Sequence, residues 1–283
     1  MRTAVTIAAT AAALALAACG GSNESVDATL AASEAGVVHV HGLAVDPGDG
    51  ALLVATHRGL LRAPAGETAL RPVGTQTPDL MGFTVLSPNR YVASGHPGAQ
   101  DDQPANLGLV ESRDGGLTWR PTSLHGEADF HLLEGRGALL YGGDVRSGSF
   151  LRSTNGGRSW RPATLPAPTI DVVLDPGALD GLVASTAEGL FRSDDGARTW
   201  ERLGEGSGLL AWGRAGLLVA AGDGFVHVSR DGGRTLERAS RLSGPPEAVA
   251  AHGSAFFAAV HGGVVHVSED GARTWQVRAA PRP

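Results

Sequence analysis

The chain has 283 residues, and its 23 basic and 29 acidic side chains give a formal net charge of −6. All of the basic residues are Arg, which excludes mechanisms that depend on a Schiff-base or phosphate-binding Lys. The acidic balance, without any block of basic residues, argues against nucleic acid as a partner. The 41 Gly and 16 Pro residues predict many tight turns rather than helices.

The N-terminal segment has the pattern of a bacterial export signal. Arg2 supplies a positive charge, and residues 4–18 form an apolar run shorter than the ~20 residues of a membrane-spanning helix. The run ends in the sequence LAAC, which resembles the lipobox of bacterial lipoprotein precursors. This resemblance implies that residues 1–18 are removed and that Cys19 is acylated. We therefore expect an extracytoplasmic protein that is lipid-anchored to the bacterial cell membrane.

Residues 19–36 are rich in Gly, Ser and Ala, and this composition predicts a flexible tether after the lipidated Cys19. Cys19 is also the only cysteine of the chain, so the sequence excludes an internal disulfide. The folded part is expected to begin after the tether, at residue 37.

A segment of eight residues occurs five times, and its copies begin at Ser112, Ser153, Ser193, Ser229 and Ser268. The spacings of 41, 40, 36 and 39 residues between these Ser positions are typical of propeller blades. Short apolar runs separated by Gly favour four antiparallel strands in each repeat. A sixth, degenerate copy over residues 51–73 has Ala63 in place of the Ser. The sequence therefore predicts an all-β protein with a single β-propeller over residues 37–283, made of six four-stranded blades, with seven as the alternative count.

Two positions of the repeated segment have clear structural chemistry. The acidic side chain at the third position can accept backbone N–H bonds within a turn. The Trp at the eighth position is expected to pack its ring under the hairpin, toward the next blade. The third position holds Asp114, Asn155, Asp195, Asp231 and Asp270, and the eighth holds Trp119, Trp160, Trp200 and Trp275, with Leu236 as the exception.

These segments resemble the Asp-box, or bacterial neuraminidase, repeat. The resemblance covers nearly the whole mature chain and implies a β-propeller with each box on the turn between the third and fourth strands of a blade. It does not imply sialidase activity, because the boxes of that superfamily lie away from the active face. The boxes are therefore interpreted as structural.

Most of the ten His residues are expected at the mouth opposite these turns. That mouth is formed by the loops that enter each first strand and by those that join the second and third strands. Clustered imidazoles with a nearby thioether and carboxylates are suitable ligands for copper, zinc or another late transition metal. For each His, the alternative role is a hydrogen bond that holds a loop. The predicted ligands are His39, His41, His57, His96, His131 and Met81.

The same order of strands predicts where five further residues lie. Asp79 and His261 are also expected at the mouth, whereas His252 is assigned to the opposite end of its strand. His227 and His266 precede two of the repeated turns and are expected to be structural.

The stretches HVHGLAVDP, ATHRGL, DLMGF, SGHPG and ADFHLL are also similar to a group of bacterial Asp-box lipoproteins. Members of that group are commonly labelled glycosylhydrolase or exo-sialidase-like. A sialidase needs three Arg around the substrate carboxylate, but only Arg58 and Arg146 fall in loops of the predicted mouth. The sequence therefore argues against sialidase chemistry.

Two functions follow from the sequence. We favour a non-enzymatic binding or assembly protein, with a protein, small molecule or glycan as ligand at the mouth. The alternative is a glycoside hydrolase that uses two carboxyl groups at the mouth. Its candidate catalytic residues are Asp129, Asp144 and Asp171.

Overall fold

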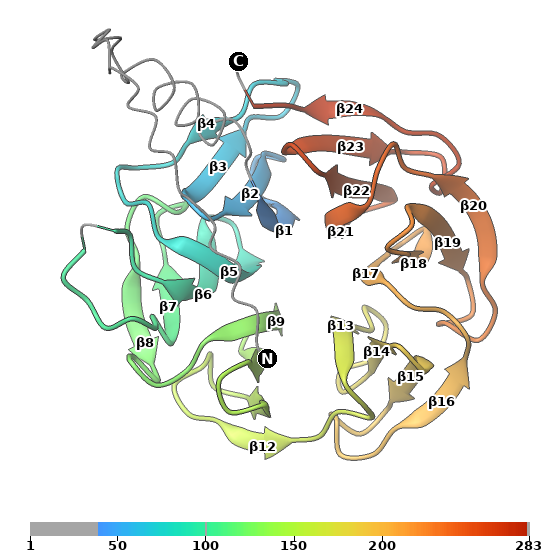
Figure 1. The fold of residues 1–283 in the computed structure, drawn as a ribbon, viewed down its shortest axis with the longest axis horizontal. Coiled ribbons are helices and arrows are strands. Elements are labelled where there is room, and N and C mark those ends of the chain that lie inside the picture. The colour runs from blue at the N-terminus through green and yellow to red at the C-terminus, as the bar shows by residue number, and fades with distance from the viewer. Residues whose placement is uncertain (1–38, 100, 282–283) are drawn as a thin grey trace, which may run out of the picture. The chain divides into compact units, whose positions relative to one another are not determined.

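The computed structural model describes residues 39–99 and 101–281, which form six four-stranded antiparallel sheets. The sheets are arranged around a central axis as the blades of a β-propeller (Figure 1). Each blade is one continuous segment of chain whose strands follow in sequence order from the axis outward. The predicted fold class and the count of six blades are confirmed. The predicted signal peptide, the tether and Cys19 lie outside the described residues.

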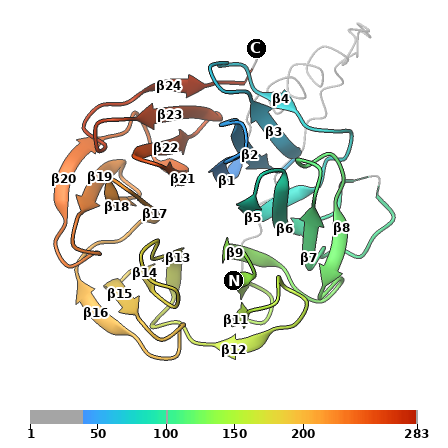
Figure 2. The same cartoon turned by 180° about the vertical axis from the view of Figure 1, so that it is seen from behind.

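The first three blades run from residue 40 to residue 163, and the ring is seen from behind in Figure 2. Blade 1 consists of β1 (Val40–Val45), β2 (Leu52–Thr56), β3 (Gly59–Ala63) and β4 (Arg71–Pro72). Blade 2 consists of β5 (Asp79–Ser87), β6 (Arg90–His96), β7 (Leu109–Ser112) and β8 (Arg120–Ser123). Blade 3 consists of β9 (Phe130–Arg136), β10 (Leu139–Asp144), β11 (Ser149–Ser153) and β12 (Arg161–Ala163).

The last three blades run from residue 169 to residue 279. Blade 4 consists of β13 (Thr169–Leu174), β14 (Leu182–Thr186), β15 (Gly189–Ser193) and β16 (Glu201–Gly204). Blade 5 consists of β17 (Leu209–Gly213), β18 (Gly216–Ala220), β19 (Phe225–Ser229) and β20 (Glu237–Arg241). Blade 6 consists of β21 (Pro246–His252), β22 (Ala255–Val260), β23 (Val264–Ser268) and β24 (Gln276–Ala279).

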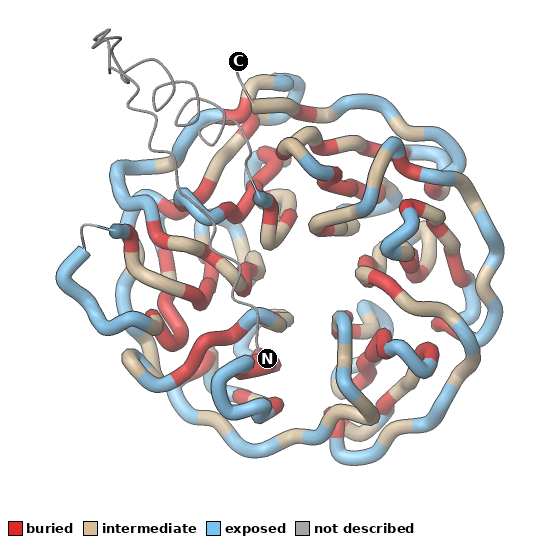
Figure 3. The backbone as a smooth tube through the Cα atoms, in the orientation of Figure 1, coloured by how far each residue is buried: buried red, intermediate tan, exposed pale blue. Residues whose placement is uncertain are grey.

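Burial changes from strand to strand within a blade. The second strands β2 (LLVAT) and β14 (LVAST) are buried at every residue, as expected of strands covered on both faces. The fourth strands lie at the circumference and are largely exposed, which Figure 3 shows as pale blue segments on the outer edge. The apolar runs of the sequence therefore supply the inner strands, and the polar segments supply the outer edge.

Six clusters of buried apolar side chains lie between neighbouring blades, one cluster at each seam. The cluster between blades 2 and 3 includes Leu109 and Phe130, and the cluster between blades 6 and 1 includes Val54 and Phe257. Beside this last cluster, a parallel bridge joins Ala69 to Ala280 and closes the ring. Because each seam has its own apolar core, the propeller is held together by packing between blades.

The repeated eight-residue segments form the turns between the third and fourth strands of blades 2 to 6. In blade 2, Ser112 donates its hydroxyl to Asp114 (2.9 Å), and Asp114 accepts hydrogen bonds from both the hydroxyl and the N–H of Thr118. The hydrogen bonds from Thr118 contribute most to lowering the pKa of Asp114, to about 2. The Asp114 carboxylate therefore stabilises the turn by accepting hydrogen bonds from residues of the turn itself.

The Trp rings of these turns pack against the preceding blade, so the predicted direction toward the next blade is wrong. Trp160 of blade 3 donates its ring N–H to Ser123 of blade 2 (3.0 Å), and Trp275 of blade 6 donates to Ser240 of blade 5 (2.9 Å). Each turn lies on the blade face that the preceding blade covers, so the ring meets the fourth strand of that blade. The Trp residues stabilise the seams from the outside.

Candidate functional site

Five of the six innermost strands of the described propeller contain a β-bulge near the same end. In blade 1, Val40 pairs with Thr56 and Gly42 pairs with Ala55, which leaves His41 as the extra residue. A β-bulge leaves one residue unpaired and redirects its side chain, and bulges are common beside functional sites. The residues in the bulged positions are His41, Met81, His131, Ile170 and Glu247.

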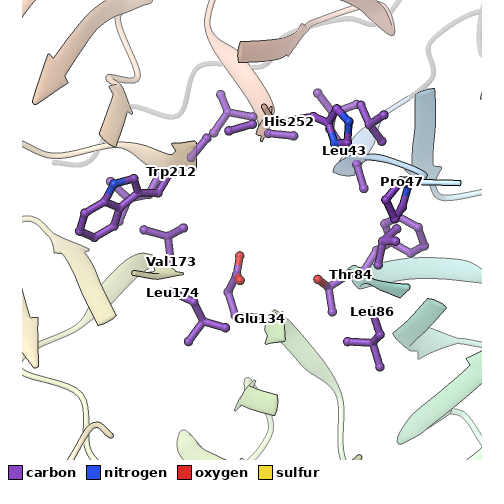
Figure 4. Close-up of a pocket in the computed structure, with 18 residues that line it drawn as sticks. Leu43, Pro47, Thr84, Leu86, Glu134, Val173, Leu174, Trp212 and His252 are labelled. Carbon is purple, nitrogen blue, oxygen red and sulfur yellow. The ribbon is translucent and has the colours of Figure 1, made fainter. Parts of the chain in front are cut away.

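All five bulged residues line one cavity of about 170 Å³ on the propeller axis. A second cavity of about 340 Å³ is lined by the other ends of the same strands and includes His252, which is therefore away from the other mouth residues as predicted. Glu134 lines both cavities, and Figure 4 shows its carboxyl group pointing into the space between the innermost strands. The bulges thus place four potential metal-binding side chains around the entrance to an axial channel.

The first group of potential ligands lies at the seam between blades 1 and 2. His41 occupies the bulge, His57 lies in the turn after β2, and Asp79 begins β5. His57 Nδ1 lies 3.1 Å from His41 Nε2 and 2.9 Å from Asp79 Oδ2. Asp79 Oδ1 is buried, lies 3.5 Å from His41 Nε2, and finds no hydrogen-bond donor among the described residues. Two imidazoles and a carboxylate therefore converge on one point.

The environment of His41 keeps its imidazole neutral. The pKa of His41 is lowered from 6.5 to about 4, mainly by burial and next by the charge of nearby His57, while Asp79 acts in the opposite direction. A neutral imidazole is the form that binds a metal ion. At pH 7, His41 therefore needs no deprotonation before it can act as a ligand.

A second group lies at the seam between blades 2 and 3. Asp129 Oδ2 lies 3.2 Å from His131 Nε2 and 3.6 Å from His96 Nε2. The buried Oδ1 of Asp129 finds no donor among the described residues. His96 contacts the carbonyl of Ala105 through Nδ1 (2.8 Å), and a proton on Nδ1 leaves the Nε2 lone pair facing the group. Metal-binding imidazoles commonly make such a hydrogen bond through their other nitrogen.

A third group lies at the seam between blades 6 and 1. Glu247 Oε1 lies 3.4 Å from His39 Nδ1 and 3.2 Å from His261 Nδ1. Glu247 Oε2 accepts the backbone N–H of Val40 (3.1 Å), which orients the carboxylate. In each of the three groups, one ligand atom from every member lies within 4.8 Å of the others.

The structure brings the five predicted His ligands to one mouth but divides them among three groups. Met81 lines the same cavity from the bulge of β5. Asp79 and His261, expected at the mouth but not among the predicted ligands, complete two of the groups. Sequence reasoning missed Glu247, which is equivalent to His41 at the bulged position of an innermost strand, because that equivalence appears only in the pairing of the strands.

The carboxylate of Asp144, a candidate catalytic residue, is occupied by hydrogen bonds. It accepts the N–H groups of Asp129 (2.9 Å) and Arg146 (3.2 Å) and the hydroxyl of Ser147 (2.5 Å). Burial raises the pKa of Asp144, but the hydrogen bonds from Ser147 and the backbone outweigh burial, so the pKa is lowered. These contacts give Asp144 a loop-capping role.

Asp171, another candidate catalytic residue, connects two blades. Its carboxylate oxygens accept the N–H of Val172 (2.8 Å) and the N–H of Leu210 (2.7 Å) in blade 5. Burial raises the pKa of Asp171 to about 7, and this effect is opposed by both hydrogen bonds. The third candidate, Asp129, belongs to the second His group.

No protein-family model and no curated protein matches the chain. Among solved structures, the GH74 enzyme of Niastella koreensis matches with a TM-score of 0.58 and 18% identity, over 86% of this chain and 45% of that protein. A GH74 xyloglucanase from Xanthomonas campestris matches with a TM-score of 0.56 and 21% identity, over 87% and 41%. PorZ, a bacterial surface component of the type-IX secretion system of Porphyromonas gingivalis, matches with a TM-score of 0.52 and 12% identity, over 87% and 38%.

These similarities define the class of the protein as a β-propeller, and at such low identity they show the fold alone. The chain spans less than half the length of each of these three proteins. The similar structures include glycoside hydrolases as well as a surface component. The function of this chain must therefore be argued from its own residues.

Proposed function

We propose that the protein is a lipid-anchored, extracytoplasmic binding propeller that holds copper or zinc at its His-rich mouth. The observation that carries this proposal is the convergence of His41, His57 and Asp79, with a buried Asp79 oxygen that no donor of the described residues satisfies. An unsatisfied buried acceptor costs about 1–3 kcal/mol, more when it is charged, and a bound cation removes that cost. Two imidazoles and one carboxylate are a known ligand set for zinc and suit copper.

A metal ion held by three protein ligands keeps coordination positions open. His41 also lines the axial cavity, so a protein side chain, a small molecule or a glycan bound in that cavity could complete the coordination. This arrangement supports a role in ligand binding or assembly, in which the metal is part of the binding surface.

Calorimetric titration of the full-length lipoprotein, purified in detergent without a His-tag, tests the proposal. We expect micromolar or tighter binding of copper or zinc at pH 7.5, and weaker binding in the Asp79→Asn variant. His252→Ala is the matched control, because His252 lies at the other end of the channel and should leave binding unchanged. Absence of copper and zinc binding by the unaltered protein would refute the proposed metal site.

The lipid anchor is proposed from the N-terminal sequence and has its own test. In the described part of the chain, no helix is long and apolar enough to cross a membrane. Because Cys19 is the proposed acylation site, Cys19→Ser should release the protein from the membrane fraction, and the mass of the mature protein should lose its lipid. Unchanged membrane partitioning and mass in this variant would argue against lipidation.

Glycoside hydrolysis is the alternative function, and one observation favours it. The pKa of Asp171 is raised to about 7, as a general acid requires, although both oxygens of this carboxylate hold backbone N–H groups. A panel of chromogenic glycosides, assayed with and without a chelator, tests it. Turnover that survives chelation and is lost in Asp129→Asn or Asp171→Asn would replace the metal proposal.

A further inference from the structure

We infer that the mouth binds three metal ions, one at each of three consecutive seams between blades. This inference rests on the proposed metal-binding function and extends it from one site to a row of sites. The three groups lie at the seams between blades 6 and 1, 1 and 2, and 2 and 3, and they share no ligand. Their members are His39, His261 and Glu247; His41, His57 and Asp79; and His96, His131 and Asp129.

The three groups use the same three kinds of position in the blades. Each takes one His from the region where the second strand of a blade turns into the third, namely His261, His57 or His96. A second ligand comes from a bulge in an innermost strand, which belongs to the same blade for His261 and His57 and to the next blade for His96. A third ligand comes from the entry to that next blade. The bulge ligands are Glu247, His41 and His131, and the entry ligands are His39, Asp79 and Asp129.

Every group contains two imidazoles and one carboxylate, so each has the ligand set of a separate divalent-metal site. A single site shared by all six His would leave two of the three carboxylates without a cation. The buried oxygens of Asp79 and Asp129, which find no donor in the part of the chain that the structure describes, belong to different groups, so one ion at one seam cannot satisfy both. We therefore assign one metal ion to each carboxylate.

Neighbouring groups are close enough to influence one another. The ring centroid of His39 lies 5.6 Å from that of His57 and 6.5 Å from that of His41, across the boundary between two groups. Because each carboxylate neutralises only part of a divalent charge, ions at adjacent seams repel each other. The three ions should bind in successive steps of decreasing affinity.

Blades 4 and 5 differ from blade 1 at the positions that would hold ligands, so the row of proposed sites does not continue into them. Blade 4 has the same bulge as blade 1, but the bulged residue is Ile170, and Ala187 occupies the position of His57 in the turn. The innermost strand of blade 5 pairs with its neighbour without a bulge. Over the residues that the structure describes, no fourth group of this composition occurs.

Metal stoichiometry tests this inference. The full-length lipoprotein in detergent is dialysed against excess zinc and analysed for bound metal by mass spectrometry, with the calorimetric titration run in parallel. We expect three equivalents of zinc for the unaltered protein. Each of the isosteric variants Asp79→Asn, Asp129→Asn and Glu247→Gln should retain two.

Glu188→Gln in the turn of blade 4 is the matched control and should retain three equivalents. An unfolding midpoint close to that of the unaltered protein shows that a variant is folded. One equivalent in the unaltered protein, weakened by Asp79→Asn but not by Asp129→Asn or Glu247→Gln, would overturn the row of sites and leave the proposed single site standing. Absence of zinc and copper from the unaltered protein would overturn both.

Discussion

Blade 1 and blade 4 form the same backbone at the mouth with different side chains. In blade 1, the Thr56 hydroxyl donates to the carbonyl of Gly59 (2.9 Å), and in blade 4 Thr186 donates to Gly189 at the same distance. Blade 1 has His57 within this turn, whereas blade 4 has Ala187. Because the turn forms with either residue, folding alone does not account for the imidazole.

The innermost strands of the two blades also share a backbone conformation and differ in their side chains. Both contain a bulge at the same register, and the extra residue is His41 in blade 1 and Ile170 in blade 4. The residue after the bulge is Gly42 in blade 1 and Asp171 in blade 4. The blade therefore supplies a constant backbone, and substitutions at a few positions decide whether the mouth carries the proposed metal ligands.

Converting the mouth of blade 1 into that of blade 4 should have the largest effect. The double variant His41→Ile, His57→Ala removes two of the three ligands at one seam, and we expect about 1000-fold weaker binding there, about 4 kcal/mol. The free energy of unfolding should change by less than about 1 kcal/mol, because blade 4 folds with these residue types. Calorimetric titration and denaturant unfolding measure the two quantities. A large loss of stability would mean that the imidazoles serve folding after all.

Trp200 distinguishes the two blades at the outer edge. Blade 1 has no Trp turn, whereas Trp200 of blade 4 donates its ring N–H to the carbonyl of Thr164 (2.9 Å) and packs at the seam with blade 3. Trp200→Ala should reduce the free energy of unfolding by about 3 kcal/mol, at the low end for Trp because the ring is half-buried. Denaturant titration measures the loss, and metal binding by the folded protein should persist. An unchanged unfolding midpoint would show that the ring does not stabilise the seam.

A matched pair of Thr variants distinguishes the contribution of the shared turn to stability from its contribution to metal binding in blade 1. Thr56→Val and Thr186→Val each remove a buried hydroxyl that donates to one backbone group and accepts from another, at a cost of about 2 kcal/mol. Both variants should lose similar stability, but only Thr56→Val should weaken metal binding, about tenfold, because it releases the turn that positions His57. Equal effects of both variants on metal binding would contradict the assignment of the site to blade 1.

A last effect is expected from Glu134 of blade 3, whose side chain lines the axial cavity together with Asp171 of blade 4. Burial, together with the charge of Asp171, raises the pKa of Glu134 to about 8. The folded protein therefore retains a proton that the unfolded chain loses above about pH 4.5, so Glu134 reduces stability as pH rises from about 4.5 to 8. Glu134→Gln should be more stable than the unaltered protein at pH 8, by at least about 1 kcal/mol, and equal to it at pH 4. Thermal unfolding at both pH values checks this, and equal stability at pH 8 would refute it.

The sequence by itself determined the architecture, because the signals for it are local. Repeats of 36 to 41 residues, apolar runs and Gly-rich turns predicted six four-stranded blades, and Ala63 ends β3 where Ser193 ends β15. The order of strands within a blade also assigned most His residues to one mouth. Each of these inferences needs only neighbouring residues, whose hydrogen bonds and burial repeat from blade to blade.

Only the tertiary structure decided which ligands meet. Glu247 lies beside His39 because the ring closes, although 208 positions separate them in the chain. The bulges at His41 and Glu247 shift the alternation of side chains by one residue, and no pattern in the sequence marks where that shift occurs. The direction of the Trp rings depended in the same way on which neighbouring blade covers each turn. Contacts across seams depend on how whole blades pack, and a local sequence pattern describes only the blade in which it occurs.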